Sequence, residues 1–499
     1  MRKVKEEQLP LGAVPIPQIE IDLNSRDEIA QLLYGLQALY SDPDSRKKSF
    51  ELLDKILSSN VNHRTGRKGM EIWQILVLGL LRANCNWDFD HLLDMANNHI
   101  KIREIMGLGP YDLRKFKLQT IKDNLSLLTS DVLDEVNALV VTAAHKKLGH
   151  EQENIKGKCD SFVVETDVHY PTDINLLLDA IRKVIELTAK ICTGLGLTEW
   201  RQSKHILKKI KKKYRKAQKL KPSKSKNDEK KQEREQEIIK AHQEYIDIVL
   251  FYLNKAKMTL ESLTQDHGTE NVFLALLPIE KFINHAERQI DQIYRRVVLG
   301  ETIPHSEKVF SIFEEHTEWI SKGKAGVPQE LGLNVCIVQD QHGFILHHRV
   351  MQGEKDQEVA VPIVEETQRT FSNFKNCSFD KGFWSPANHN KLGTILEEVI
   401  LPKKGKLSKN DKEEQSSESF IEGRRQHPVV ESSINALENH GLDRCLDHGI
   451  NGFKRYISLS VLARNIQILG HKLQKSMRKK LKMIEKIKKA KASKIYQPA

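Results

Sequence analysis

Apolar residues recur at helical spacing through most of the first 150 residues. The segment 49–57, SFELLDKIL, places its apolar side chains at positions i, i+3, i+4 and i+7 of an amphipathic helix. Residues 1–40 begin polar and proline-marked and end in a helix. The pattern therefore predicts an N-terminal arm (1–40) and an all-helical domain (41–150). Further helices in that domain are expected at 71–83, 91–96, 99–106, 118–128 and 130–147.

A second helical region is expected at 174–300, where the sequence shows three long helical patterns. Within it, 204–221 is strongly basic, and a low-complexity Lys/Glu/Gln run continues to residue 236. This composition predicts a helical hairpin with a charged, partly disordered tip. A charge run of this kind forms either a solvated face or a surface that contacts nucleic acid.

Short β-forming runs are distributed around this helical region. Alternating or apolar runs predict strands at 158–168, 333–340, 344–351, 377–380 and 398–401. Helices are expected after the third, fourth and fifth of these strands. Such an order predicts a ribonuclease-H-like α/β domain, with a mixed five-stranded sheet interrupted by a helical insert. The expected bounds are 151–180 with 325–470 for this domain, 181–324 for the insert and 471–499 for a basic tail.

Composition narrows the choice of partners. The formal net charge is +12 over 499 residues, which favours a polyanion, with nucleic acid ahead of an anionic membrane. No apolar run reaches the ~20 residues of a spanning helix, and no apolar segment follows the basic N-terminus as in a secretory signal. The six cysteines form no CxxC pair, which indicates a reducing, cytoplasmic location and argues against structural zinc.

Three carboxylates are the candidate catalytic residues. Asp160 and Asp380 lie in predicted strands that are neighbours in this topology, and the helix with Glu431 packs on the same sheet. Three such carboxylates hold two Mg²⁺ ions about 3.5–4 Å apart, with Mn²⁺ as a substitute. Two alternatives stay open: Asp167 for the first position and Asp356 for the second. Glu438, one heptad past Glu431, is a further inward-facing candidate.

Several cations near these carboxylates are candidate phosphate ligands, because arginine binds phosphate in bidentate fashion. The nearest in sequence are Arg424, Arg425, His427 and Lys381. Two weaker groups lie in basic turns: Lys322 and Lys324, and Arg64, Arg67 and Lys68. The second turn joins two predicted helices, as in helix-turn-helix DNA-binding modules.

At these residues the chain resembles bacterial insertion-sequence transposases of the Asp-Asp-Glu type, closest to the group long filed as "not classified yet". Four stretches carry the likeness, and TGRKGM at 65–70 is similar to the helical entry domain of that group. The four are CDSFVVETDVHYPTD (159–173), TEWISKGKAG (317–326), SFDKGF (378–383) and HPVVESSINALENHGLD (427–443).

The resemblance implies that Asp160, Asp380 and Glu431 are the catalytic triad and metal ligands. It also implies binding to the terminal inverted repeats of the protein's own element, nicking at the element's ends, and strand transfer into target DNA. Two ends must be processed together, so a homodimer or larger assembly on DNA is expected, in the nucleoid-containing cytoplasm. The alternatives are a nuclease of the same fold without strand transfer, and a catalytically inactive DNA-binding protein.

Overall fold

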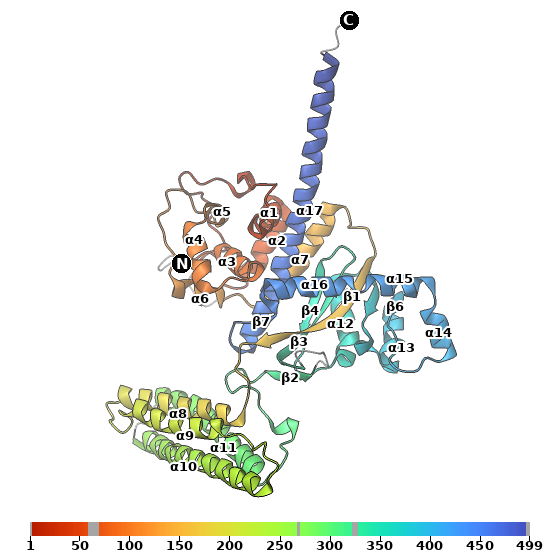
Figure 1. Cartoon of the computed structure of the whole chain (residues 1–499). Coiled ribbons are helices and arrows are strands. Elements are labelled where there is room, and N and C mark those ends of the chain that lie inside the picture. Colours follow the sequence, from red (N-terminus) through yellow and green to blue (C-terminus); the bar gives the residue numbers. More distant parts are fainter. Residues whose placement is uncertain (1, 58–68, 267–269, 322–327, 496–499) are drawn as a thin grey trace. The chain divides into compact units, whose positions relative to one another are not determined.

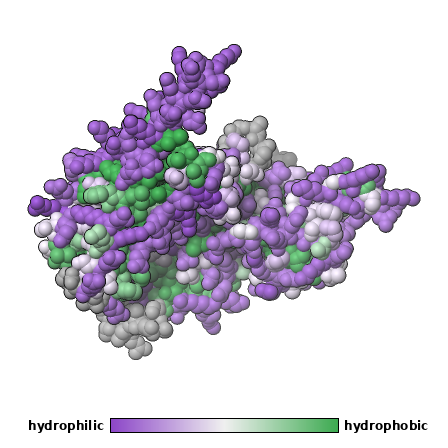
Figure 2. Space-filling view, turned by 90° about the horizontal axis from the view of Figure 1, so that it is seen from below, coloured by the Kyte–Doolittle hydropathy of each residue, from purple (hydrophilic) through white to green (hydrophobic). Residues whose placement is uncertain are grey.

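The computed structural model describes residues 2–57, 69–266, 270–321 and 328–495. The chain forms two compact units (Figure 1). One contains Met1–Asp167 and Ile320–Ala499, and the other is Val168–Trp319. The second unit therefore begins before the predicted insert, 181–324. Within the described ranges, no helix is both long enough and apolar enough to span a membrane, and hydrophilic side chains cover much of the face drawn in Figure 2.

A mixed sheet of seven strands forms the α/β part of the first unit. Its central path runs β2-β3-β1-β5-β6, with β4 beside β3 and β7 beside β1. Strand β1 is antiparallel to β3 and parallel to β5, and β5 is parallel to β6. The bounds are β1 Ile155–Thr166, β2 Glu318–Ser321, β3 Gln329–Gln339, β4 Ile345–Val350, β5 Phe374–Phe379, β6 Glu398–Ile400 and β7 Arg444–Cys445.

The five predicted strands are all present, and the prediction of a mixed α/β sheet is confirmed. The number five was wrong, because β2 and β7 were not predicted. Strand β7 has only two residues, which pair with Glu165 and Thr166 at the end of β1. Two residues are too few to show the alternation of apolar and polar side chains that predicts a strand. The pairing of β7 depends instead on the strand beside it.

Helices cover both faces of this sheet. On one face, α12 (Asp356–Thr370) buries Val359 and Ile363 in the same core cluster as Cys159 of β1. On the other face, Phe162 of β1 packs with Val430 of α16 (Val429–Leu437). Successive residues of β1 therefore point to opposite covered faces, as the two-residue repeat of a strand requires.

The N-terminal part of the same unit contains helices and no strand within its described residues, as predicted for 41–150. Its elements are η1 Ile16–Gln18, α1 Glu28–Ser41, α2 Pro43–Asp54, α3 Ile72–Asn84, α4 Phe89–Asn98, α5 Ile100–Ile105, α6 Leu118–Leu125 and α7 Ser130–Leu148. Helix α3 is buried on all sides, because other helices of the unit surround it.

The last helix, α17 (Gly449–Ile495), joins the N-terminal helices to the sheet (Figure 1). A Cβ atom at Gly470 would lie 1.9 Å from the carbonyl oxygen of Gln31, and one at Gly35 would lie 2.2 Å from that of Ile466. Only glycine permits α1 and α17 to cross this closely. One continuous helix contains both its apolar first part and the basic segment that begins at residue 471.

Four helices rather than a hairpin make up most of the second unit. They are α8 Asp173–Gly194, α9 Ser203–Lys219, α10 Asp228–Asp266 and α11 Glu270–Ile293, followed by the short η2 Tyr294–Val298 and η3 His305–Glu307. Helix α9 buries Ile206, Ile210 and Tyr214 along one side and exposes lysines on the other. The Lys/Glu/Gln run is helical from Asp228, where α10 begins.

Candidate active site

Two of the predicted carboxylates lie side by side where β5 ends beside the middle of β1. The register pairs Cys159 of β1 with Phe379 of β5. The next residues along these strands, Asp160 and Asp380, therefore stand next to each other. Asp380 directly follows β5 and precedes the short helix η4 (Lys381–Phe383). Its side chain is exposed, whereas that of Asp160 is half-buried.

The third carboxylate comes from the helix on the Phe162 face of the sheet. Helix α16 buries Val430, Ile434 and Leu437, and Glu431 projects beside this apolar row in the first turn. The pattern of residues 424–442 predicts a single helix of about four turns, but the structure divides these residues among three helical elements. Helix α16 continues directly into the π-helical segment η5 (Glu438–Leu442), where Gly441 has φ +102°. Such a positive φ favours glycine, and it interrupts the helical conformation at Gly441.

Electrostatics connect the three groups. Burial and the neighbouring carboxylates Asp380, Asp356 and Glu431 together raise the pKa of Asp160 to about 7, against the hydrogen bond from the Ser161 backbone N–H. That N–H donates to Asp160 Oδ1 at 2.8 Å. The strongest charged influences on Asp160 are thus all negative. This arrangement is what a site for bound cations requires.

Asp356 is a fourth carboxylate at this site. It is the first residue of α12, as predicted, and its Oδ1 accepts a hydrogen bond from Ser161 Oγ at 2.7 Å. Burial and the charge of Asp380 raise its pKa. A Cβ atom on Gly382 would lie 2.7 Å from Asp356 Oδ2, so glycine at this position leaves room for the carboxylate.

Sequence reasoning treated Asp356 as a rival of Asp380, whereas the structure brings both to the same place. The relevant signal was the serine after Asp160. Asp160 and Ser161 point to opposite faces of β1, so a polar residue on each face indicates polar partners on both sides of the strand.

The other two alternatives lie elsewhere. Asp167 follows the end of β1, with its side chain 54% exposed and 3.8 Å from Arg444. Glu438 begins η5 and is not among the principal charges that act on Asp160. The geometry therefore favours Asp160 over Asp167 as the β1 carboxylate.

The predicted phosphate contact of His427 does not fit its position. The residue is 4% exposed, and its Nδ1 lies 3.0 Å from Ser378 Oγ on β5. Burial and the charges of Arg424 and Lys158 together lower the pKa of His427 to about 4, against the opposing charge of Asp380. A neutral buried imidazole is not available to DNA. His427 instead holds the end of α15 (Glu418–Gln426) against β5, just before Asp380.

The remaining predicted cations differ in their access to solvent. Lys381 and Arg425 are exposed beside the carboxylates, and Arg424 donates to the Phe379 carbonyl oxygen at 3.4 Å. The expected loop 403–415 contains helix α14 (Lys409–Gln415), and α13 is Pro386–Ile395. Five predicted contacts, Lys322, Lys324, Arg64, Arg67 and Lys68, lie outside the described residues.

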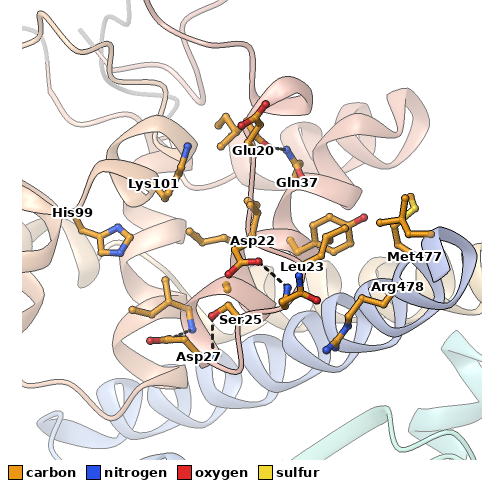
Figure 3. Close-up of a pocket in the computed structure, with 18 of the residues that line it drawn as sticks. Glu20, Asp22, Leu23, Ser25, Asp27, Gln37, His99, Lys101, Met477 and Arg478 are labelled. Carbon is orange, nitrogen blue, oxygen red and sulfur yellow. Dashed lines mark hydrogen bonds between the residues drawn. The ribbon is translucent and has the colours of Figure 1, made fainter. Parts of the chain in front are cut away.

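A large groove of the first unit lies away from the carboxylates. It has a volume of about 1110 Å³ and is lined by the segment before α1, by α1 itself, by α17 and by His99 and Lys101, with none of the four carboxylates in its wall. Figure 3 shows the segment with Asp22 and Ser25 between His99 and Lys101 on one side and Met477 and Arg478 on the other. The candidate active site lies instead at the carboxyl end of β5, beside the middle of β1.

Comparison of the chain with protein-family models, with curated proteins and with solved structures found no match.

Proposed function

We propose that this protein is a DNA transposase of the Asp-Asp-Glu type with a ribonuclease-H-like catalytic domain. The observation that carries the proposal is that the charges of Asp380 and Glu431 act on Asp160. These residues come from adjacent parallel strands and from a helix that packs on the same sheet. Asp160 is distant in sequence from the other two, so their proximity supports a shared site.

The strand order supports the ribonuclease-H-like assignment. The sheet path β4-β3-β1-β5-β6 places the first strand in the centre and the parallel β5 beside it. The connections between β1, β3 and β4 are antiparallel and those from β1 to β5 and β6 are parallel. The second unit, Val168–Trp319, is inserted directly after β1.

The donor set at this edge fits Mg²⁺. Asp160, Asp356, Asp380 and Glu431 offer only oxygen ligands, and their mutual repulsion is relieved when a divalent cation binds. Two bound ions would activate an attacking water or 3′-hydroxyl and stabilise the leaving oxygen. Ser161 orients two of the carboxylates through its backbone N–H and its hydroxyl.

Positive charge near the edge supports a nucleic-acid substrate. Lys381 and Arg425 are exposed next to Asp380 and before Glu431. In the second unit, α9 exposes a cationic face opposite its buried Ile206, Ile210 and Tyr214. These cations are proposed to contact the DNA backbone, with the element's terminal inverted repeats as the specific site and a dimer or larger assembly holding two ends.

The test is cleavage of a plasmid that carries the gene's own flanking DNA, in Mg²⁺ and in Mn²⁺. Wild type should cut at two defined boundaries and join the freed ends to target DNA. Glu431→Gln should bind the same DNA without cutting it, and Glu438→Gln, seven residues further along, serves as the matched control that still cuts.

Other outcomes separate the alternatives. Cutting without joined products would indicate a nuclease of this fold. Tight, salt-sensitive binding with no metal-dependent product, in wild type as in the variant, would indicate a DNA-binding protein and overturn the enzymatic proposal.

A further inference from the structure

A second cluster of potential metal ligands lies around the segment just before β1, whereas Asp160 of the candidate active site lies in the middle of that strand. His150 and Glu153 lie in the segment between α7 and β1, and His342 lies in the turn between β3 and β4. One ligand atom from each of these side chains lies within 4.8 Å of the other two, and no other group of His, Cys, Asp or Glu in the described ranges is this close.

The three side chains are arranged around the Glu153 carboxylate. His150 Nδ1 lies 2.7 Å from Glu153 Oε1, and His342 Nε2 lies 2.8 Å from Glu153 Oε2. The two imidazole rings are stacked, with centroids 3.7 Å apart. Both rings therefore direct a nitrogen toward the same carboxylate from two chain segments that are far apart in sequence.

Surrounding contacts fix these groups in place. The backbone N–H of His342 donates to Asp340 Oδ1 at 2.8 Å, and the buried Asp340 also pairs with His145 Nε2 at 2.6 Å. Gln341 Nε2 donates to Glu153 Oε2 at 3.3 Å. Partners of this kind orient first ligands in metal sites and reduce the rearrangement that binding requires.

We propose that His150, Glu153 and His342 bind one Zn²⁺ ion, which fastens the start of β1 to the β3–β4 turn. Two imidazole nitrogens and one carboxylate oxygen form a ligand set that zinc accepts, with water in the fourth tetrahedral position. Zinc bonds of about 2.0–2.1 Å separate neighbouring ligand atoms by roughly 3.3 Å. The present contacts need to open by only about half an ångström.

This site differs in chemistry from the edge with Asp160. Imidazole nitrogen favours zinc over Mg²⁺, whereas four carboxylates favour Mg²⁺. Glu153 keeps 46% of its side chain exposed, so an ion has a path from solvent. The bound zinc ion would join the end of α7, which belongs to the N-terminal helices, to the sheet.

The experiment uses the full chain, stripped of metal with a chelator and then returned to chelator-free buffer. Zinc chloride is titrated into it calorimetrically, and the visible spectrum of added Co²⁺ reports nitrogen ligation. We expect one tight site per chain in wild type. His342→Gln and Glu153→Gln should each weaken it at least tenfold and remove the Co²⁺ bands.

His389→Gln is the matched control, because His389 also pairs with a surface glutamate, Glu414 at 3.0 Å, but has no second histidine beside it. This variant should bind zinc as wild type does. Equal zinc affinity in wild type and in His342→Gln, or no site in wild type at micromolar zinc, would overturn the proposal. Since neither readout involves DNA, failure here leaves the proposed transposase activity untouched.

Discussion

The start and the middle of β1 accommodate partly buried charge in opposite ways. Just before the strand, Glu153 lies between His150 and His342, with each carboxylate oxygen within 2.8 Å of an imidazole nitrogen. In the middle of the strand, Asp160 accepts a hydrogen bond from the Ser161 N–H, but its strongest charged neighbours are other carboxylates.

The difference shows which of the two sites is incomplete without a ligand. A carboxylate that is paired with neutral or cationic donors contributes to folding in its own right. Carboxylates that repel one another cost stability, and they persist at sites where a bound cation or a reaction needs them. The zinc proposed for the site at Glu153 would add to an arrangement that is already satisfied, whereas Mg²⁺ at the site of Asp160 would relieve one that is not.

The largest effect is expected from Asp380→Asn, which removes a proposed metal ligand from the centre of the carboxylate group. Loss of several kcal/mol of transition-state stabilisation corresponds to a fall of about a thousandfold or more in the cleavage rate. DNA binding, measured by gel shift in Ca²⁺ or EDTA, should be retained. Cleavage at the wild-type rate would remove Asp380 from the active site.

Asp160→Asn should have two effects of opposite sign. The pKa of Asp160 in the folded protein, about 7, lies above the ordinary value of 3.8. A raised carboxyl pKa favours folding at low pH, and this contribution is lost as pH rises through about 7. At pH 8 without metal, the ionised group therefore costs up to about 4 kcal/mol, and asparagine avoids that cost while abolishing cleavage.

Thermal unfolding at pH 5 and pH 8, with and without Mg²⁺, checks this prediction. The variant should be the more stable protein at pH 8 in EDTA. Its advantage should shrink at pH 5, and also in saturating Mg²⁺, which stabilises only the wild-type site. Asp167→Asn, at the exposed end of the same strand, should show none of these changes. A variant less stable than wild type at pH 8 in EDTA would contradict the assigned repulsion.

Much of the fold and of the carboxylate site could be predicted from the sequence, because both depend on the local pattern of apolar and polar residues. The five main strands and the positions of Asp160, Asp380 and Glu431 on their elements follow from alternation and helical spacing. The role of Asp356 did not follow, since its approach to Ser161 depends on how α12 packs across the sheet. Nor did the cluster with His342, because it joins segments almost 190 residues apart through the β3–β4 turn.

The burial of individual side chains was the other property that could not be predicted from the sequence. His427 stands next to two arginines and was expected to bind phosphate with them, yet α15 turns it inward to Ser378. The boundary between α15 and α16 falls at this point, and the direction of each side chain follows from that break. A linear charge pattern gives the composition of a surface but not which member of it is covered.

A smaller effect is expected from Asp356→Asn. If Asp356 supports the metals from the α12 side, cleavage should fall roughly tenfold and the Mg²⁺ concentration for half-maximal rate should rise, as when supporting groups of metal sites are removed. Gly382→Ala, which would place a Cβ atom 2.7 Å from Asp356 Oδ2, should shift the Mg²⁺ requirement in the same direction. An unchanged Mg²⁺ requirement in both variants would restrict Asp356 to a structural part in anchoring α12.

The smallest effect per residue is expected from replacing lysines on α9. The charges of these lysines are exposed to solvent and face no like charge at close range. If its exposed face contacts DNA, Lys208, Lys209 and Lys212 each neutralise a phosphate. Changing all three to glutamine should then reduce the slope of log K against log salt by up to about 3, since each contact contributes about 0.9. The helix supplies its own control: Lys213 and Lys216 lie 2.9 and 3.0 Å from Glu244 of α10, so their replacement should change the slope much less. Equal slopes in wild type and in the triple variant would identify this face as solvated only, and the DNA contacts would have to be sought among Lys381, Arg425 and the basic end of α17.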